Sequence, residues 1–252
     1  MNDFRLVSVV IPAYNSASYI TETLVSVINQ SYTNIEIICV NDCSTDDTLN
    51  VVKYFREQIE RDIHFEVISL KANSKTAAAR NKGIRESNGY FILPLDSDDC
   101  IDSHYIEKAV QIFASNPKVG VVYCKARQFG DVNENWYLPP FCPDRIVKRN
   151  MVHSAGLFRK NDWIKYGGYD ERLVYGLEDW DFWLKFVEDN QFFFQIPEYL
   201  LSRRVLKNSR SSLLENKRQL KESLGMIRKS HKRLIWRRKL SRLRRSIFQK
   251  SA

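Results

Sequence analysis

The chain has 252 residues, 44% of them hydrophobic, which is enough for one sizeable domain with a small appendage. No stretch approaches the roughly 18 uninterrupted apolar residues that a membrane-spanning helix needs, and the N-terminus lacks the pattern of a secretory signal. We therefore expect neither a membrane-spanning nor a secreted protein, but one that stays in the cytoplasm.

The net charge of +9 is unevenly distributed along the chain. Residues 217–252 contain 14 Lys and Arg and one acid, for a charge of +13, while the remainder contains 25 basic and 29 acidic residues, for −4. The basicity therefore belongs to a C-terminal tail. We expect this tail to contact an anionic membrane surface and not nucleic acid, since it carries no recognisable nucleic-acid-reading motif.

Short apolar runs rich in β-branched or aromatic residues predict buried strands. These predicted strands cover 6–12, 35–40, 65–70, 90–95, 119–124 and 192–196. Helical periodicity predicts a first helix with Ser18 as its N-cap, and further helices around 49–55, 76–87, 103–114 and 178–189. Because strands and helices alternate, we predict an α/β fold with a mainly parallel sheet covered by helices on both faces.

Polar residues follow several predicted strands at the point where each strand ends. They are Tyr14 and Asn15 after the first strand, Asn41 and Asp42 after the second, and Asp96 to Asp99 after the fourth. Ligands of such sheets bind beyond the carboxyl ends of the strands. The sequence therefore predicts one site at this edge of the sheet.

Three carboxylates in four positions, in LDSDD (95–99), form the most acidic turn of this edge. Their mutual repulsion favours a bound cation, and Mg2+ or Mn2+ fits because it is held by one or two carboxylates and shares its other positions with phosphate oxygens. The alternative is an exposed acidic turn that caps the helix beginning near Ser103.

Two further motifs contain candidate functional residues. In EDWD (178–181), Asp179 is a candidate general base with aromatic side chains nearby, although these acids could equally favour a helix N-terminus. In AAARNKGI (77–84), Arg80 could pair with a phosphate or lie solvated at the surface.

The motifs VVIPAYN (9–15), VNDCSTDDT (40–48), AAARNKGI, LPLDSDD (93–99), GGYDERL (167–173) and GLEDWDFWLK (176–185) occur together and in this order. Over roughly residues 5–205 the chain thereby resembles the family 2 glycosyltransferases of bacterial cell-surface polysaccharide synthesis. The resemblance implies the GT-A fold, with a mainly parallel Rossmann-like sheet, in a domain of residues 1–212. Residues 213–252 would form a separate basic helical tail.

The resemblance also implies roles for single residues. Pro12, Tyr14, Asn15 and Asp42 would contact the uridine, and Arg80 would face the nucleotide. Asp96 would contact the ribose or the metal ion, and Asp98 would bind the metal. Asp179 would be the base of a single inverting displacement, and Glu178 and Trp183 would contact substrate. The implied reaction moves a sugar from a nucleotide-diphosphate donor, a UDP-sugar, to a hydroxyl of a glycan or lipid-linked acceptor.

The chain departs from the family in one place, because Leu206 stands where a metal-binding histidine is common. This departure leaves two rivals open: a metal-dependent sugar-nucleotide hydrolase, and a non-catalytic binding protein of the same fold. In the tail, residues 213–250 have a helical pattern with Trp236, Leu240, Leu243 and Ile247 on one face. We expect this helix to lie on the inner face of the cell membrane; a packing helix or a solvated tail is the alternative.

Overall fold

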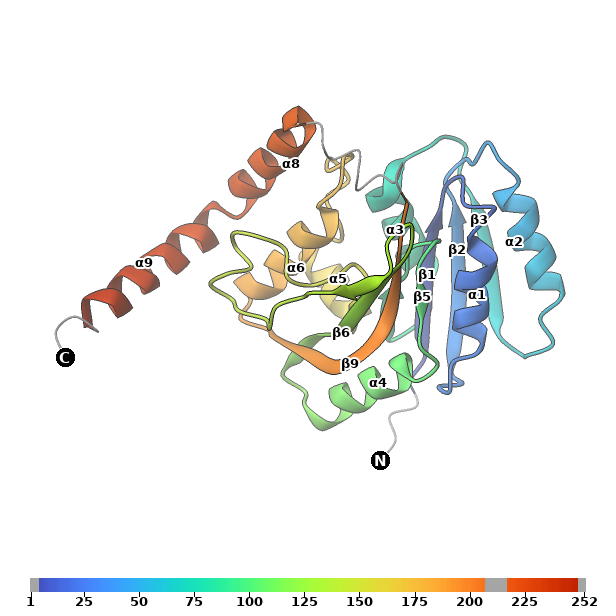
Figure 1. The fold of residues 1–252 in the computed structure, drawn as a ribbon, viewed down its shortest axis with the longest axis horizontal. Helices are drawn as coiled ribbons and strands as arrows, with labels where there is room; N and C mark the ends of the chain where they lie inside the picture. The colour runs from blue at the N-terminus through green and yellow to red at the C-terminus, as the bar shows by residue number, and fades with distance from the viewer. Residues whose placement is uncertain (1–4, 207–216, 249–252) are drawn as a thin grey trace.

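The computed structural model describes residues 5–206 and 217–248, with side chains as far as residue 240. The strands form one sheet in the order β3-β2-β1-β4-β8-β6-β9-β5, and β7 pairs with β6. Helices cover both faces of this sheet, as expected (Figure 1).

The first half of the chain alternates strictly between strand and helix. Its elements are β1 (Val7–Ala13), α1 (Ile20–Ile28), β2 (Ile35–Asn41), α2 (Thr48–Glu57), β3 (His64–Ser69), α3 (Lys75–Glu86) and β4 (Phe91–Pro94). β1 pairs in parallel with both β2 and β4, and β2 with β3. One predicted detail is wrong: Tyr19, not Ser18, is the N-cap of α1, and no side chain caps that helix.

The second half departs from the predicted parallel pattern. Its elements are β5 (Cys100–Ile101), α4 (Tyr105–Ser115), β6 (Val119–Gly130), β7 (Glu134–Trp136), β8 (Leu157–Arg159), α5 (Lys160–Tyr166), α6 (Glu178–Glu188) and β9 (Phe192–Val205). β8 runs antiparallel to both β4 and β6, whereas β6 and β9 pair in parallel with register shifts between Val119 and Ala126. Irregularities of this kind bend a strand pair, and they let β6 and β9 curl past the rest of the sheet.

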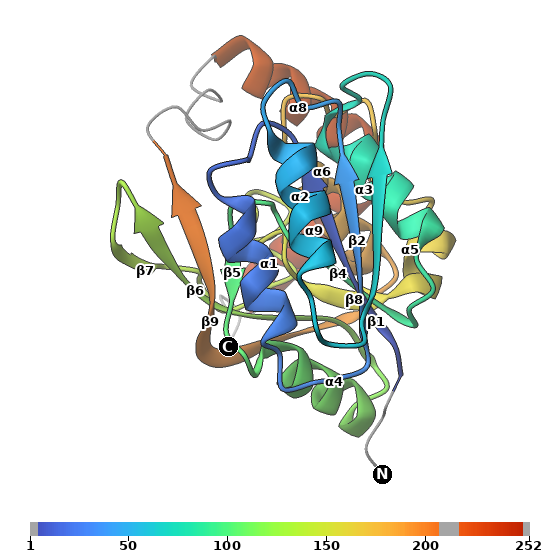
Figure 2. The same cartoon turned by 90° about the vertical axis from the view of Figure 1, so that its right-hand side faces the viewer.

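Two apolar cores lie on the two faces of the sheet. One packs α1, α2 and α4 against residues such as Val9 and Ile37, and the other packs α3 and α6 against residues such as Val10 and Ile38. The alternation along β1 and β2 is the period-two pattern of a strand buried on both sides. Figure 2 looks onto α1 and α2, with the strands behind them.

The C-terminal segment forms two helices, α8 (Lys217–Ser230) and α9 (Lys232–Phe248), where the sequence predicts one. Ile227 of α8 and Leu234 of α9 are buried in the same core as α6, so this segment packs against the body of the protein. The predicted boundary between residues 212 and 213 lies outside the described residues, as do the side chains of Leu243 and Ile247. Among the described helices, none has the length and apolar character needed to cross a membrane.

Candidate active site

The carboxyl ends of β1, β2 and β4 open into a cleft of about 640 Å³. It is lined by almost all of the residues expected to hold a nucleotide or metal: Pro12, Tyr14, Asn15, Asp42, Arg80, Asp96, Asp98 and Glu178. Of the predicted site residues, only Asp179 and Trp183 do not line it. Most of the predicted site residues therefore line one cavity at the predicted edge of the sheet.

Asp42, which follows β2, is buried and accepts hydrogen bonds from the next βα unit. Its Oδ1 accepts from the backbone N of Ser74 at 2.7 Å and from the Ser74 Oγ at 2.8 Å, and its Oδ2 accepts from the backbone N of Lys75 at 2.9 Å. Asp42 thus holds the loop before α3 in place, and lines the cleft from that fixed position.

Asn15 joins the first two loops of the cleft. Its Oδ1 accepts from the backbone N of Thr45 at 2.8 Å, and its own backbone N donates to the Ser44 Oγ at 3.1 Å. The neighbouring Tyr14 stays 47% exposed on the cleft wall, so its ring is available to a ligand. Loops fixed in this way form a preformed pocket, with an exposed aromatic side chain at its rim.

The three carboxylates of the acidic turn after β4, those of Asp96, Asp98 and Asp99, have different surroundings. Asp96 pairs with Arg80 and accepts from the Ser154 Oγ at 3.1 Å. Asp99 is buried and accepts from the backbone N of Arg204 at 2.9 Å. Burial, with the neighbouring charge of Asp96, raises the pKa of Asp98 to about 6. A carboxylate of raised pKa facing a cleft is one whose negative charge is incompletely offset by the protein.

Arg80 lines the cleft and is held there by ion pairs within the protein. Its side chain is 2% exposed and lies between two carboxylates, pairing with Asp96 and, at 2.9 Å, with Glu178 of α6. Burial opposes its charge, but these two carboxylates outweigh burial and raise the pKa of the guanidinium. Arg80 is therefore neither a solvated surface arginine nor a free phosphate ligand. It ties the acidic turn to α6.

The donor groups of the cleft fit a divalent cation that is completed by substrate. Within the described residues no group of three or more His, Cys, Asp and Glu side chains is arranged to hold a metal ion, so there is no all-protein cage. Mg2+ and Mn2+ do not require one, because one or two carboxylates suffice when phosphate oxygens and water supply the remaining ligands. The carboxylates of Asp98 and the neighbouring Asp96 have the chemistry of such ligands, whereas Leu206 lines the cleft without a metal-binding group.

A second chamber of about 310 Å³ adjoins the cleft and contains Asp179. The two cavities share Arg80, Asp96, Asp99, Glu178 and Arg203 as walls. Asp179 is the second residue of α6, and its Oδ2 accepts a hydrogen bond from the Nδ2 of Asn150 at 2.8 Å. Asp98 and Asp179 therefore face adjoining spaces, separated by the ion pairs of Arg80.

The basicity of Asp179 suits a general base. Burial and then the charge of Glu178 raise its pKa to about 6, although Arg80 opposes the shift. His153 lines the same chamber, but burial lowers its pKa to about 4. At neutral pH both groups are unprotonated, and Asp179 is the stronger base.

Trp183 does not take the predicted position. Its side chain is fully buried, and it packs edge-on against Phe158 and Phe193 and tilted against Phe182 and Phe186. It lines neither chamber, so it is a core residue and cannot present its ring to a sugar. The aromatic side chain in the second chamber is Trp136 of β7, stacked against the guanidinium of Arg203 at 4.8 Å.

Strained backbone gathers around the two chambers. Five non-glycine residues among those described have positive φ, and four of them, Asn15, Cys43, Lys75 and Leu177, line a chamber or directly follow a residue that does. Leu177, at φ +71°, immediately precedes Glu178 and Asp179. Holding a bulky side chain at positive φ costs conformational free energy, and such strained residues are typical of functional sites.

The sequence did not reveal several residues of the site. Asn150 and Ser154 lie in a loop with no periodic pattern, and Trp136 lies in a strand of three residues. The arginines Arg203 and Arg204 of β9 form the far wall of the cleft. Two signals were present in the sequence. The paired arginines are two charges that interrupt an apolar strand pattern, and Trp136 begins the stretch 136–143, whose Trp, Pro and Tyr content predicts binding loops.

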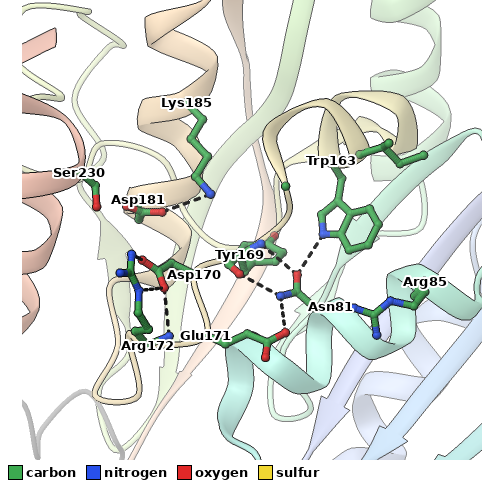
Figure 3. Close-up of a pocket in the computed structure, with 12 residues that line it drawn as sticks. Asn81, Arg85, Trp163, Tyr169, Asp170, Glu171, Arg172, Asp181, Lys185 and Ser230 are labelled. Atoms are coloured by element: carbon green, nitrogen blue, oxygen red, sulfur yellow. Dashed lines mark hydrogen bonds and ion pairs between the residues drawn. The ribbon is translucent and has the colours of Figure 1, made fainter. Parts of the chain in front are cut away.

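Another cavity, of about 580 Å³, lies on the side of α3 that bears Asn81 (Figure 3). Asn81 accepts from the Trp163 Nε1 at 3.0 Å and donates to the backbone O of Tyr169 and to Glu171, both at 2.9 Å. These bonds anchor the loop between α5 and α6. None of the predicted site residues lines this cavity, and its polar groups are largely paired with one another, so we assign it no chemistry.

A family model for glycosyl transferase family 2 matches residues 8–174, which contain the whole cleft except its α6 and β9 walls. The chain belongs to glycosyl transferase family 2. Its sequence is 29% identical to a hyaluronan synthase of Pasteurella multocida over 235 residues, 92% of this chain. The match covers 23% of that synthase, so the chain spans about a quarter of this relative.

Solved structures confirm the GT-A fold for this family 2 chain. TarS of S. aureus in complex with UDP-GlcNAc has a TM-score of 0.69 at 22% identity, covering 82% of this chain and 60% of that one. The mannosyltransferase PcManGT from Pyrobaculum calidifontis, in complex with GDP-Man and Mn2+, has a TM-score of 0.68 at 21% identity, covering 83% of this chain and 59% of that one. At these identities the likeness shows the fold alone.

Proposed function

We propose that the chain is an inverting glycosyltransferase that moves a sugar from a UDP-sugar to a hydroxyl of a glycan or lipid-linked acceptor in cell-surface polysaccharide synthesis. The observation that carries this proposal is the pair of adjoining chambers, one with Asp98 and one with Asp179, separated by the ion pairs of Arg80. The hyaluronan synthase and the UDP-GlcNAc complex of TarS support the polysaccharide and the uridine, respectively.

The donor would lie in the cleft between the loops after β1 and β2. Tyr14 and Pro12 offer apolar surface to the base, and Asn15 and Asp42 fix the loops that hold the nucleoside. The diphosphate would lie at the acidic turn, with Asp98, and Asp96 beside it, holding Mn2+ or Mg2+. Such an ion offsets the negative charge that grows on the departing diphosphate.

The acceptor would enter the second chamber. Asp179, held by Asn150, takes the proton of the acceptor hydroxyl as the oxygen attacks the anomeric carbon and the bond to the diphosphate breaks. Because the hydroxyl attacks from the chamber opposite the leaving group, one displacement inverts the anomeric centre. Trp136 and Leu138 give the acceptor an apolar wall.

A screen of UDP-sugars and GDP-sugars for thermal stabilisation, with and without Mn2+, tests the donor assignment. We expect a UDP-sugar to raise the melting temperature only when metal is present. The same UDP-sugar is then assayed for nucleoside diphosphate release with and without candidate acceptors. Release that needs no acceptor would indicate a hydrolase, and metal-dependent binding without any turnover would indicate a non-catalytic binding protein.

A further inference from the structure

The C-terminal helices are fixed to the body through a histidine between two carboxylates. His231, at the junction of α8 and α9, is 2% exposed, and its two ring nitrogens lie 2.9 Å from Asp181 and 2.9 Å from Glu188, both on α6. Ile227 and Leu234 bury apolar surface on either side of it. These contacts hold α8 and α9 in a fixed orientation on the helix that carries Asp179.

Over residues 232–240, where its side chains are described, the opposite side of α9 faces away from the body. Successive residues of an α-helix are rotated by about 100°, so Trp236 lies on the side of α9 away from His231, Leu234 and Arg238. Trp236 is 62% exposed, whereas Arg238 turns toward the body and bonds Asp144 at 3.5 Å. In Figure 1, α9 runs away from the sheet toward the outer edge of the molecule.

Basic residues surround the exposed tryptophan. Lys232, Arg233, Arg237 and Lys239 are all exposed, and with Trp236 they form the outer face of α9. Within residues 231–240 the helix contains no acid, and the chain outside 217–252 carries −4. The charge asymmetry therefore directs this face, and not the body, toward a polyanionic surface.

We propose that the outer face of α9 binds an anionic lipid bilayer, with Trp236 at the level of the headgroups and the four basic side chains on lipid phosphates. Tryptophan is favoured at this depth because it combines an apolar ring with one hydrogen-bond donor. Basic residues on the same face add an attraction to the anionic leaflet, which in cells is the inner one. The bilayer is favoured over nucleic acid because the large aromatic side chain of Trp236 is exposed in the middle of the basic residues of this face.

Docking through α9 has a consequence for the acceptor. Since His231 joins α9 to α6, the Asp179 chamber takes a fixed position above the bilayer when the outer face is bound. A lipid-linked acceptor confined to the same surface would then meet Asp179 at a raised effective concentration. Membrane binding does not rest on the proposed transfer activity, so each can fail while the other holds.

Cosedimentation of the full chain with vesicles tests the proposal. Vesicles of phosphatidylcholine alone are compared with vesicles of phosphatidylcholine mixed with phosphatidylglycerol. We expect binding only to the anionic vesicles. Each basic residue near an anionic surface strengthens binding by about fivefold, so replacing Lys232, Arg233, Arg237 and Lys239 together by Gln should weaken it by about 100-fold or more.

A matched control is available on α2, where Tyr54 is 67% exposed and Lys53 and Arg56 are exposed nearby. The variant with Tyr54→Ala, Lys53→Gln and Arg56→Gln should bind vesicles as the parent does. Brominated lipids provide a direct probe of depth: they should quench tryptophan fluorescence in the parent and much less in Trp236→Phe. UDP-sugar binding should be unchanged in both sets of variants, since neither touches the cleft.

Two results would overturn the proposal. One is equal vesicle binding by the parent and the fourfold Gln variant. The other is quenching by brominated lipids that persists in Trp236→Phe, which would place another tryptophan at the membrane. A duplex oligonucleotide that binds the parent through the same four residues, while vesicles do not bind, would assign this face to nucleic acid instead.

Discussion

The proposed donor side and the proposed acceptor side of the site are held together in different ways. On the donor side, the bonds that shape the cleft join consecutive βα units: Asp42 reaches Ser74, 32 residues on, and Asn15 reaches Thr45, 30 residues on. On the acceptor side, Arg80 reaches Glu178 across 98 residues, and α6 is in turn held by His231. The donor pocket thus follows from local topology, whereas the Asp179 chamber depends on contacts made by the whole chain.

Asp98→Asn breaks the donor side with the largest expected effect. The substitution keeps the shape of the side chain but removes its charge, and a bound Lewis-acid ion contributes several kcal/mol, so metal-dependent transfer should fall by about 1,000-fold. Calorimetric titration with donor and Mn2+ should show the matching loss of binding. The control is Asp102→Asn, an exposed carboxylate outside the cleft. Metal-dependent donor binding that survives in Asp98→Asn would mean that the ion is held elsewhere.

Arg80→Met cuts the link between the two sides. It removes the buried cation that pairs with both Glu178 and Asp96, which should lower the free energy of unfolding by about 3–5 kcal/mol. Urea denaturation measures this loss. Arg85→Met, an exposed change on the same helix, should alter stability by no more than about 0.5 kcal/mol. If Arg80→Met unfolds at the parental urea concentration, the arginine does not hold the two sides together.

His231→Asn loosens the acceptor side at the junction of α8 and α9. Replacing hydrogen bonds between charged groups should cost about 1.5–3 kcal/mol of the free energy of unfolding at neutral pH. Burial lowers the pKa of His231, but Asp181 and Glu188 outweigh it and raise the pKa to about 9, from 6.5 in an unfolded chain. The stabilisation is therefore complete below pH 6.5 and is lost as the pH rises through about 9.

Urea denaturation at a series of pH values distinguishes the contribution of His231 to stability from a general effect of pH on the protein. The parent should lose stability between pH 6.5 and about 9, and His231→Asn should lose much less over the same range. His104→Asn, which changes an exposed histidine of the body, should follow the parent. Parallel curves for the parent and His231→Asn would show that His231 is not charged in the folded protein.

The pH dependence of transfer has the smallest expected effect and probes Asp179 itself. Because its pKa is raised to about 6, the base is protonated below that pH. At saturating Mn2+, kcat/KM should fall about tenfold per unit below pH 6 and level off above it. A profile that stays flat through pH 6 would show that the titrating base is not Asp179.

The loops of the proposed donor cleft could be predicted from the sequence because each of them follows directly after a strand that is recognisable by itself. Each strand from β1 to β4 is an apolar run that ends in polar residues, and parallel βα units bring those ends to one edge of the sheet. β5, β7 and β8 have only two or three residues each, too few to show a period in the sequence. β8 is antiparallel to β4 and β6, strands that are distant from it in the sequence, so its direction could not be predicted locally. The parallel expectation therefore held for the first four strands and for the pair β6 and β9, but not for β5, β7 and β8.

The roles of single residues were harder to predict than their positions. Trp183 lies one helical turn after Asp179 on the same side of α6, yet Phe158, Phe186 and Phe193 enclose it in the core. The chamber takes its aromatic side chain from Trp136 instead. Arg80 lies on a helix of small residues. The sequence around it does not indicate that its side chain will be buried in an ion pair with Glu178 of the distant helix α6. The amphipathic pattern of 213–250 could not show that His231 ends one helix, because its carboxylate partners lie on α6.

The division of labour between the two chambers is tested most directly by Asp179→Asn, with donor binding measured by calorimetry and transfer measured with an accepted acceptor. The substitution leaves the acidic turn and the cleft unchanged. We expect donor affinity close to that of the parent and transfer slower by about 100-fold or more, the usual loss on removing a positioned base. Transfer at the parental rate would contradict the account and move the base to another residue, with Glu178, which lines the same chamber, the next candidate.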